Sequence, residues 1–324
     1  MTIDQLKPYL AQIHLPQIGS HKGQNGKVMV IGGSELFHAA SQWSLLVVSR
    51  MVDMVFYSSV PSNNLLIHEA KQQFHNGIVI PREQIEEYIN EADVVLIGPG
   101  MERKQSSVVS SQSSEYESTL PIPNTQEPTP NEWNNDTQKV TNYILSKYSH
   151  KKWVVDAGAL QMADPALYTN KTILTPHQKE FTQLCQKLSD QDSQLLNNST
   201  TQQLFSPQYP FAKTKQPSNK ATKQLPHQPT ILLKGSIDTV MSESQSIEMS
   251  GGNVGMTKGG TGDVLAGLVA GLYAFSADPL AVSVVASFIN KKAGDTLYET
   301  VGPFFNSTDL ANQIPKVMKE VFGL

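Results

Sequence analysis

The chain lacks several features that would point to particular classes of protein. It has one cysteine, Cys185, in 324 residues, so an internal disulfide cannot form and a reducing compartment is expected. Its 25 lysines and arginines face 29 aspartates and glutamates, which gives a formal net charge of −4. This balance lacks the basic footprint of nucleic-acid binding, so we expect no nucleic-acid partner.

Long apolar runs and clusters of metal ligands are missing as well. The longest apolar stretch, residues 264–275, contains glycines and is too short to span a bilayer. The first residues show no signal-peptide pattern. None of the eight histidines forms an HxxH or HxxxH pair with carboxylates nearby. We therefore expect a cytoplasmic protein with no membrane contact and no metal site built from protein ligands.

Two common nucleotide-binding signatures are also absent. The chain contains no GxxxxGK[ST] sequence. The pattern GxGxxG fails because Leu265 stands where a third glycine would follow Gly260 and Gly262. Phosphate-loop NTPases and dinucleotide dehydrogenases of the common types are therefore disfavoured.

The most informative segment present is GGTGD at residues 259–263, which runs directly into an apolar, helix-like stretch. Its glycines let backbone N–H groups approach a ligand, and the start of a helix favours negative charge. We predict an anion hole at Gly260, Thr261 and Gly262, with the Asp263 carboxylate acting on an acceptor hydroxyl. From these five residues alone, a glycine turn with Asp263 as an ordinary helix cap is an equal alternative.

Short apolar runs rich in β-branched residues recur along the chain, and they predict a mostly parallel sheet buried on both faces. These runs are residues 27–31, 52–57, 94–97, 153–155, 172–174 and 231–233. Helices are expected between them, at residues 36–50, 82–91 and 178–188. A further helix should begin at Asp278 and Pro279 and be buried over residues 280–289, which are apolar nearly all round.

Glycines and polar residues follow these runs, where ligands bind in α/β folds. Residues 32–34 (GGS) and 98–100 (GPG) have either a binding role or a purely steric one. His177 is either functional or a buried structural histidine, and Lys234 can reach a nucleotide phosphate or stay solvated. For Asp156 we favour a turn-forming role over a role in the site.

Two polar stretches interrupt this alternation of apolar runs and expected helices, at about residues 102–136 and 189–229. They are rich in Ser, Gln, Asn, Thr and Pro and cannot bury enough apolar surface to offset their ordering entropy. Only 39% of the chain is hydrophobic and 17% charged, which agrees with a partly non-core sequence. We expect residues 1–324 to form a single domain of roughly 250 core residues with two surface insertions.

Seven segments, taken in order, resemble the NAD(P)H-hydrate dehydratase family. They are residues 28–34 (VMVIGGS), 97–100 (IGPG), 155–160 (VDAGAL), 175–177 (TPH), 233–235 (LKG), 252–253 (GN) and 259–263 (GGTGD). The likeness spans about residues 20–314 apart from the insertions. It implies an α/β, ribokinase-like fold, with a central mostly parallel sheet flanked by helices on both faces. The family is often oligomeric, so a homo-oligomer is expected, with a tetramer as one form.

The resemblance also implies a metabolite-repair reaction. Hydrated NADH or NADPH (NADHX or NADPHX) is phosphorylated on its new ring hydroxyl by ADP or ATP, and loss of phosphate restores the reduced dinucleotide. Such an enzyme is a carbon–oxygen lyase. Magnesium would accompany the phosphates of the nucleotide.

Residue roles follow from the same resemblance, position by position. Asp263 would activate the ring hydroxyl, and it would contact the hydrated dinucleotide together with Ala39, Gly100 and His177. The helix dipole should lower the pKa of Asp263 and make it a weak base. The nucleotide-binding residues would be Lys234, Gly235, Ser236, Ile237, Asp238 and Gly262.

This sequence departs from the family pattern at two places, and two other functions stay open. His38 stands where many members have glycine, and residues 51–54 (MVDM) replace a glycine-rich turn, which alters the expected wall of the dinucleotide cleft. Some members carry an epimerase domain, which we expect to be absent because about twenty residues precede the first motif. One alternative is a kinase of the same fold acting on a vitamin precursor or sugar. The other is a catalytically silent nucleotide-binding or interaction module.

Overall fold

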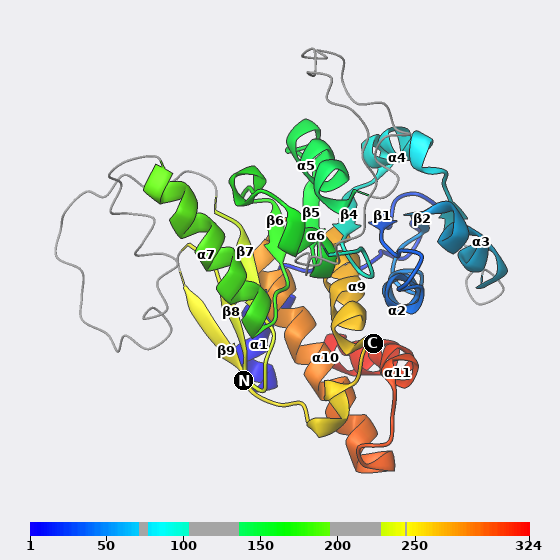
Figure 1. The fold of residues 1–324 in the computed structure, drawn as a ribbon. Helices are drawn as coiled ribbons and strands as arrows, with labels where there is room; N and C mark the ends of the chain where they lie inside the picture. Colours follow the sequence, from blue (N-terminus) through cyan, green and yellow to red (C-terminus); the bar gives the residue numbers. More distant parts are fainter. Residues whose placement is uncertain (71–76, 104–135, 195–227, 244) are drawn as a thin grey trace, which may run out of the picture.

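The computed structural model describes residues 1–70, 77–103, 136–194, 228–243 and 245–324. Nine strands within these residues form one sheet, in the order β3-β2-β1-β4-β5-β6-β7-β8-β9 (Figure 1). The strands are β1 (Lys27–Ile31), β2 (Met54–Ser58), β3 (Gly77–Val79), β4 (Val94–Ile97), β5 (Lys152–Val155), β6 (Thr172–Leu174), β7 (Thr230–Leu233), β8 (Asp238–Met241) and β9 (Ser246–Met249).

The sheet is parallel from β3 to β7, and β8 and β9 extend it in antiparallel fashion. All six strands expected from the sequence are confirmed, and the mostly parallel sheet with them. The other three strands escaped prediction for a physical reason. β3 has only three residues, and β8 and the edge strand β9 have a mixed polar pattern rather than an apolar run.

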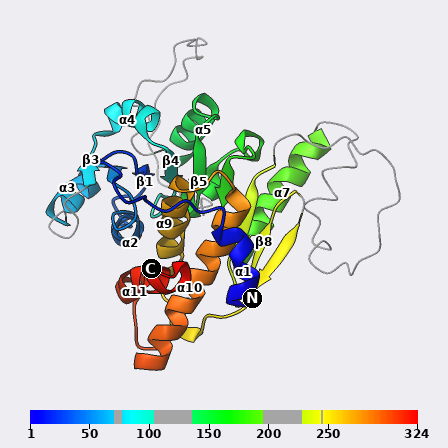
Figure 2. The ribbon, with the colours of Figure 1, turned by 180° about the vertical axis from the view of Figure 1, so that it is seen from behind.

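Helices cover both faces of the sheet. The α-helices are α1 (Ile3–Leu10), α2 (Ala39–Val48), α3 (Pro61–Ala70), α4 (Ile85–Glu91), α5 (Thr137–Lys147), α6 (Ala157–Met162), α7 (Gln178–Gln194), α9 (Thr261–Ala274), α10 (Pro279–Val301) and α11 (Ser307–Phe322). Short 3-10 helices are η2 (Arg82–Gln84), η4 (Pro165–Leu167) and η6 (Val254–Thr257). α7 crosses in front of the strands in Figure 1, whereas α1 lies in front when the molecule is turned around in Figure 2.

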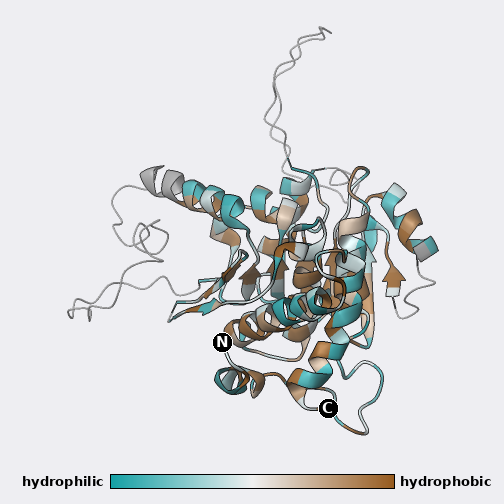
Figure 3. Cartoon of the chain, turned by 90° about the horizontal axis from the view of Figure 1, so that it is seen from below, coloured by the Kyte–Doolittle hydropathy of each residue, from teal (hydrophilic) through white to brown (hydrophobic). Residues whose placement is uncertain are grey.

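Each face of the sheet has its own apolar core. On one face, side chains of α1, α2, α9, α10 and α11 pack with strand residues. On the other, side chains of α4, α5 and α6 pack with the alternate strand residues. Figure 3 shows hydrophobic residues gathered on the strands and on the helices between them. The prediction of a helix buried over residues 280–289 is confirmed, since its apolar side chains are buried except for Phe288, which is partly buried.

The helix expected at residues 36–50 is shorter than predicted. α2 begins at Ala39 because Leu36 and Phe37 lie outside it with exposed side chains. α2 packs closely on α9, and a Cβ on Gly267 would lie 2.7 Å from the Ser44 carbonyl oxygen. The two helices therefore start at the same edge of the sheet.

That edge contains the point where the strand order reverses, between β1 and β4. The loops after these two strands touch, because the Gly33 amide donates to the Pro99 carbonyl at 2.7 Å. Gly98 has φ +123°, and a Cβ there would lie 1.8 Å from the Asp156 carbonyl oxygen. Three strand-end loops thus meet where ligands bind in open α/β sheets.

Most of the two predicted insertions, residues 104–135 and 195–227, lies outside the described residues. α7 continues to Gln194, six residues beyond the helix expected at residues 178–188. In the described part of the chain, no helix is long and apolar enough to cross a membrane.

Candidate active site

A buried ion pair forms the floor of the candidate site. Lys234 follows β7 and its Nζ lies 2.8 Å from Oδ1 of Asp156, which follows β5. Thr175, at the end of the intervening strand β6, donates its hydroxyl to the same oxygen at 2.8 Å. Asp156 is only 2% exposed. The turn-forming role that we favoured for it is therefore wrong, because its side chain holds Lys234 in place.

The ammonium group of Lys234 lies beneath the glycine loop. A Cβ on Gly262 would lie 3.3 Å from Lys234 Nζ. Burial alone would lower the pKa of Lys234, but the carboxylates of Asp156, Glu180 and Asp263 outweigh this effect and raise it. Lys234 thus supplies a fixed positive charge next to the backbone of Gly262.

The glycine loop forms the start of α9, as its sequence predicts. Gly260 is the N-cap with φ +95°, and a Cβ there would lie 2.3 Å from the ring of Trp43. The Gly260 carbonyl accepts the first intrahelical bond, from the amide of Val264. Among the described residues, the Gly262 amide has no hydrogen-bond partner, as expected at a helix N-terminus.

Thr261 contributes less to the predicted anion hole than its neighbours. Its hydroxyl donates to the carbonyls of Met256 and Lys258, and its amide makes a long 3.4 Å contact with the Lys258 carbonyl. These bonds shape the loop from within. The donor left for an anion is the Gly262 amide, beside Lys234.

Asp263 is the acidic group at this helix start, and its pKa is raised to about 7. Burial is the largest cause and the neighbouring Asp156 carboxylate adds to it, whereas Lys234 acts in the opposite direction. The expectation that the helix dipole would lower this pKa is therefore wrong, because desolvation and like charge dominate. A carboxyl with this pKa suits a general base working near neutral pH.

His177 lies at the start of α7 and is 45% exposed at its side chain. Its Nδ1 accepts the amide of Lys179 at 3.1 Å, and its own amide donates to Glu180 at 3.0 Å. Of the two alternatives, the buried structural histidine is excluded. The ring caps a helix and remains accessible to a ligand. A parallel bridge links His177 to Lys234, so the two predicted site residues are neighbours.

Ala39 and Gly100 lie together at the reversal point of the sheet. Ala39 is the first residue of α2 and is exposed. Gly100 has φ +73°, and a Cβ there would lie 2.7 Å from the Phe37 carbonyl oxygen. Only glycine allows the backbone to approach the start of α2 this closely.

A cavity of about 550 Å³ borders the Gly262 loop. Of the six residues predicted to bind the nucleotide, five line it: Lys234, Gly235, Ser236, Asp238 and Gly262. Ile237 does not line it, and its side chain is 51% exposed. Ala39, Gly100 and His177 are also outside its walls. The structure thus brings most of the predicted nucleotide-binding residues together in one cavity, and the predicted substrate-binding residues lie outside it.

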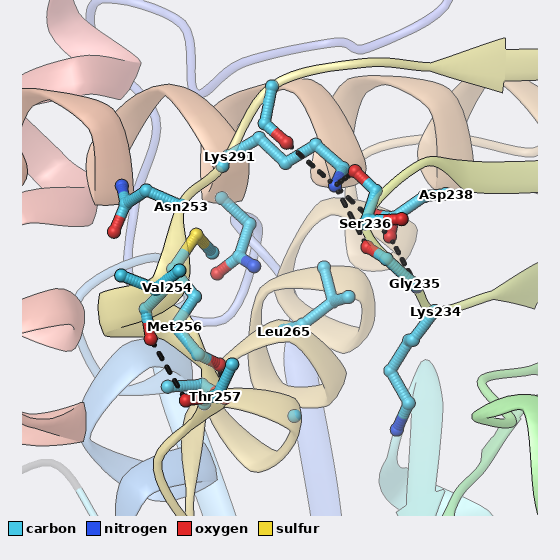
Figure 4. A pocket seen from close by; sticks show the side chains of 15 residues that line it. Lys234, Gly235, Ser236, Asp238, Asn253, Val254, Met256, Thr257, Leu265 and Lys291 are labelled. Atoms are coloured by element: carbon cyan, nitrogen blue, oxygen red, sulfur yellow. Dashed lines mark hydrogen bonds and ion pairs between the residues drawn. The ribbon is translucent and has the colours of Figure 1, made fainter.

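The cavity wall contains a buried lysine that the sequence reasoning missed. Lys291 on α10 donates to the carbonyls of Gly235, Ser236 and Gly251 at 3.0–3.1 Å (Figure 4). Asp238 lies 3.4 Å from it, and its carboxylate accepts the Gly235 amide and the Ser287 hydroxyl. These two side chains hold the β7–β8 loop in shape. The sequence signal for Lys291 was the polar pair Asn290 and Lys291 after the apolar run of α10.

The sequence reasoning also missed Asn290, the residue before Lys291 on α10. It lines the cavity and is only 4% exposed, yet its Oδ1 has no hydrogen-bond partner. Buried amides are normally satisfied, so this group is suited to a polar ligand. Val254, Met256 and Leu265 contribute apolar side chains to the cavity wall.

Metal ligands do not gather here. Among the described residues, no three His, Cys, Asp or Glu side chains come close enough to hold a metal ion. Asp238 is already occupied by protein donors. A magnesium ion entering with a nucleotide would take most of its ligands from phosphates and water.

The fold and the site together define an α/β protein of the phosphoryl-transfer type, with a nucleotide-sized cavity and a carboxylate at a helix N-terminus. The family model described as NAD(P)H-hydrate dehydratase matches residues 132–316. The chain therefore belongs to the NAD(P)H-hydrate dehydratase family, as its motifs predict.

Individual relatives agree with this assignment. The chain is 29% identical over 301 residues to the ADP-dependent (S)-NAD(P)H-hydrate dehydratase of Nitrosopumilus maritimus, covering 93% of this chain and 91% of the relative. It is 30% identical over 306 residues to the bifunctional NAD(P)H-hydrate repair enzyme Nnr of Methanocaldococcus jannaschii. That match covers 93% of this chain and 49% of the enzyme, so the chain spans about half the length of this bifunctional relative.

The fold itself is confirmed by a solved structure. A ribokinase-like superfamily protein from Enterococcus faecalis superposes with a TM-score of 0.63 at 21% identity, covering 99% of this chain and 95% of that protein. The predicted ribokinase-like fold is therefore correct.

Proposed function

We propose that this protein repairs hydrated NADH and NADPH by nucleotide-dependent dehydration. A phosphoryl group passes from the nucleotide to the hydroxyl on the damaged nicotinamide ring, and elimination of phosphate restores NADH or NADPH. One observation carries the proposal: the Asp263 carboxyl, with its pKa near 7, lies beside the Gly262 amide and the Lys234 ammonium.

In the first step, Asp263 takes the proton of the ring hydroxyl while the hydroxyl oxygen bonds to the terminal phosphorus of the nucleotide. The bond from that phosphorus to the leaving nucleotide oxygen breaks at the same time. The Gly262 amide and Lys234 stabilise charge on the transferred group from fixed positions. A general base in such a role contributes about 10²–10⁴ in rate.

In the second step, the carbon–oxygen bond of the phosphate ester breaks and inorganic phosphate leaves. The neighbouring ring carbon gives its proton to water, and the double bond of the reduced nicotinamide forms again. On the substrate side, Ala39, Gly100 and His177 border the space that the ring would occupy. The His177 ring is accessible to the substrate; its Nδ1 accepts the Lys179 amide, and its Nε2 lies 3.6 Å from Oε1 of Glu180.

The nucleotide would lie in the 550 Å³ cavity, a volume typical of small-molecule sites. We propose ADP as the phosphoryl donor, with ATP as the other candidate, because the Nitrosopumilus relative is named ADP-dependent. Magnesium bound to the phosphates would neutralise their charge.

We further propose a cytoplasmic homo-oligomer in which residues 1–324 form a single domain with two insertions. The single cysteine suits a reducing compartment. The family resemblance supports oligomer formation, with a tetramer as one form. Size-exclusion chromatography with light scattering would measure the oligomeric state.

The test is to incubate the purified protein with NADHX and ADP, then with NADHX and ATP, and to follow the NADH absorbance band. We expect the band to return only when a nucleotide is present, with one phosphate released per NADH formed. The S and R epimers should be supplied separately, because the Nitrosopumilus relative is named for the S form.

Two other outcomes would contradict the proposal. A stable phosphate ester without return of the NADH band would identify a kinase of the same fold. The absence of any nucleotide turnover would leave a binding module. Asp263→Asn is the matched control, since it keeps the shape of the side chain and removes the base.

A further inference from the structure

The guanidinium group of Arg82 is buried and has no hydrogen-bond or ion-pair partner among the described residues. Arg82 begins η2, just after β3, and is only 5% exposed. Its Nε and Nη1 atoms are buried and make no hydrogen bond. Burial lowers the pKa of Arg82 to about 10, which leaves the group charged at neutral pH. A buried charge without a counter-ion is costly, so a site of this kind is suited to an anionic ligand.

Arg82 lines a small pocket of about 120 Å³. The pocket is bounded on one side by Gly33 and Ser34, which follow β1, and on another by the start of α5. A buried cation and a helix N-terminus thus face the same space from different elements. Both favour negative charge.

Two further donors border this pocket. The Ser34 hydroxyl oxygen accepts the Phe37 amide at 3.1 Å, which leaves its own proton available. At the start of α5, Asp136 accepts the Lys139 amide, and the Thr137 amide has no partner among the described residues. These groups complement a ligand rich in acceptor oxygens.

Three carboxylates also line the pocket, and none of them pairs with Arg82. Asp136 caps α5 and lies 3.8 Å from Lys139. Glu35 and Glu102 are exposed to solvent, and within the described residues neither forms an ion pair with the guanidinium. Exposed charges are screened by water, so the buried cation dominates the local preference.

The pocket adjoins the predicted substrate side. It includes Met101, which follows Gly100 directly, and a Cβ on Gly100 would lie 3.2 Å from the Gly33 Cα. We propose that Arg82, with Ser34 and the start of α5, binds a phosphate group of the hydrated dinucleotide. This inference rests on the proposed function for the identity of the ligand. The phosphate is either in the pyrophosphate bridge or at the 2′ position of NADPHX.

The test measures binding rather than turnover, with NADPH and NADH as stable probes, by isothermal titration to the full-length protein. A hydrogen bond to a charged group contributes about 1.5–3 kcal/mol, so Arg82→Met should weaken NADPH binding about tenfold or more. Weaker binding of NADPH alone assigns the 2′-phosphate to the pocket. Equal weakening of NADH binding assigns the pyrophosphate bridge.

Arg50→Met is the matched control, since Arg50 is bonded to Asn312 and Leu46 outside this pocket and the variant should bind both probes normally. Arg82→Lys keeps the charge and should recover part of the affinity, and it replaces the methionine variant if that variant fails to fold. Unchanged binding of both probes by a folded Arg82 variant would overturn the inference. Binding that depends on Arg82 in a protein without dehydratase activity would refute only the proposed function.

Discussion

The chemistry of the site depends on the surroundings of one carboxyl group. Asp263 is desolvated, close to the Asp156 carboxylate and only partly compensated by Lys234. Its raised pKa makes it a better proton acceptor than a free aspartate. The same desolvation of the ionised carboxylate lowers the free energy of unfolding. Active sites commonly trade stability for function in this way.

This arrangement predicts a pH dependence of the activity. The base must be ionised to accept a proton, so kcat/KM should rise as pH increases through about 7, the pKa of Asp263. Asp263→Asn should lower kcat by about a hundredfold or more and leave nucleotide affinity nearly intact, because the backbone donors remain. Initial rates between pH 5 and 9, with nucleotide titrations of the variant, would measure both. A flat profile or an active variant would contradict the assignment.

The same pKa predicts an effect on stability with a definite sign. A carboxyl whose pKa is raised on folding favours the folded state at low pH and loses that contribution as pH rises through the folded-state value. The wild-type protein should therefore unfold at a lower temperature than Asp263→Asn at pH 8, by about 2 °C or more, with a smaller difference at pH 5. Differential scanning fluorimetry at both pH values would measure this. Equal melting temperatures of the two proteins at pH 8 would show that folding does not raise the pKa of Asp263.

At this scale the sequence predicted residue types better than partnerships. The GGTGD segment identified Asp263 and Gly262 because a glycine loop before a helix has a local signature. The link between Asp156 and Lys234 spans 78 positions and depends on three strands lying side by side. Arg82 has no local signal at all, since its lack of a partner is a property of the folded environment.

At the scale of elements, the position of the site depends on how α9 packs against α2. Gly267 allows the two helices to touch, and the Ser44 hydroxyl donates to the Asp263 carbonyl at 2.8 Å. The start of α9 is thereby fixed relative to the start of α2. Both helix starts border the proposed substrate space.

Gly267→Val should test this packing. The added side chain meets backbone rather than a flexible side chain, so overpacking should cost about 1–3 kcal/mol and lower the melting temperature by several degrees. Gly259→Ala is the matched control, because nothing lies within 4 Å of a Cβ there. Thermal unfolding would measure the difference. A valine variant as stable as the control would show that the helices can separate without loss.

Elements with strong local patterns were predictable, and elements stabilised by context were not. The buried strands and α10 have apolar runs that no other structure accommodates. α5, α6 and α11 carry mixed sequences whose apolar faces matter only once the sheet is present. The length of α7 was underestimated because its last residues are polar.

At the scale of the whole molecule, the predicted site residues follow strand ends at one edge of the sheet, and the first insertion follows β4 at this same edge. Glu102 and Asp136, which flank the first insertion, line the same 120 Å³ pocket. Glu102 and Asp136 are therefore close enough for a short linker to join the chain on either side of the first insertion.

Replacing residues 105–134 with a short Gly-Ser linker should leave the fold and the activity intact. Shortening a surface connection of this kind should change the free energy of unfolding by only about 1 kcal/mol. Thermal unfolding and the NADHX assay would check this, with the full-length chain as reference. A large drop in melting temperature would show that the segment packs on the core.

The glycines along this edge also bear on how such a protein can acquire new specificity. Side chains cannot be added at Gly33, Gly98 or Gly260 without collisions below 3 Å. Mutational drift toward a different phosphoryl donor must therefore run through the wall formed by Val254, Met256 and Leu265, where side chains already face the cavity. Substitutions in this wall can change which nucleotide binds, while the glycine positions of the site are kept.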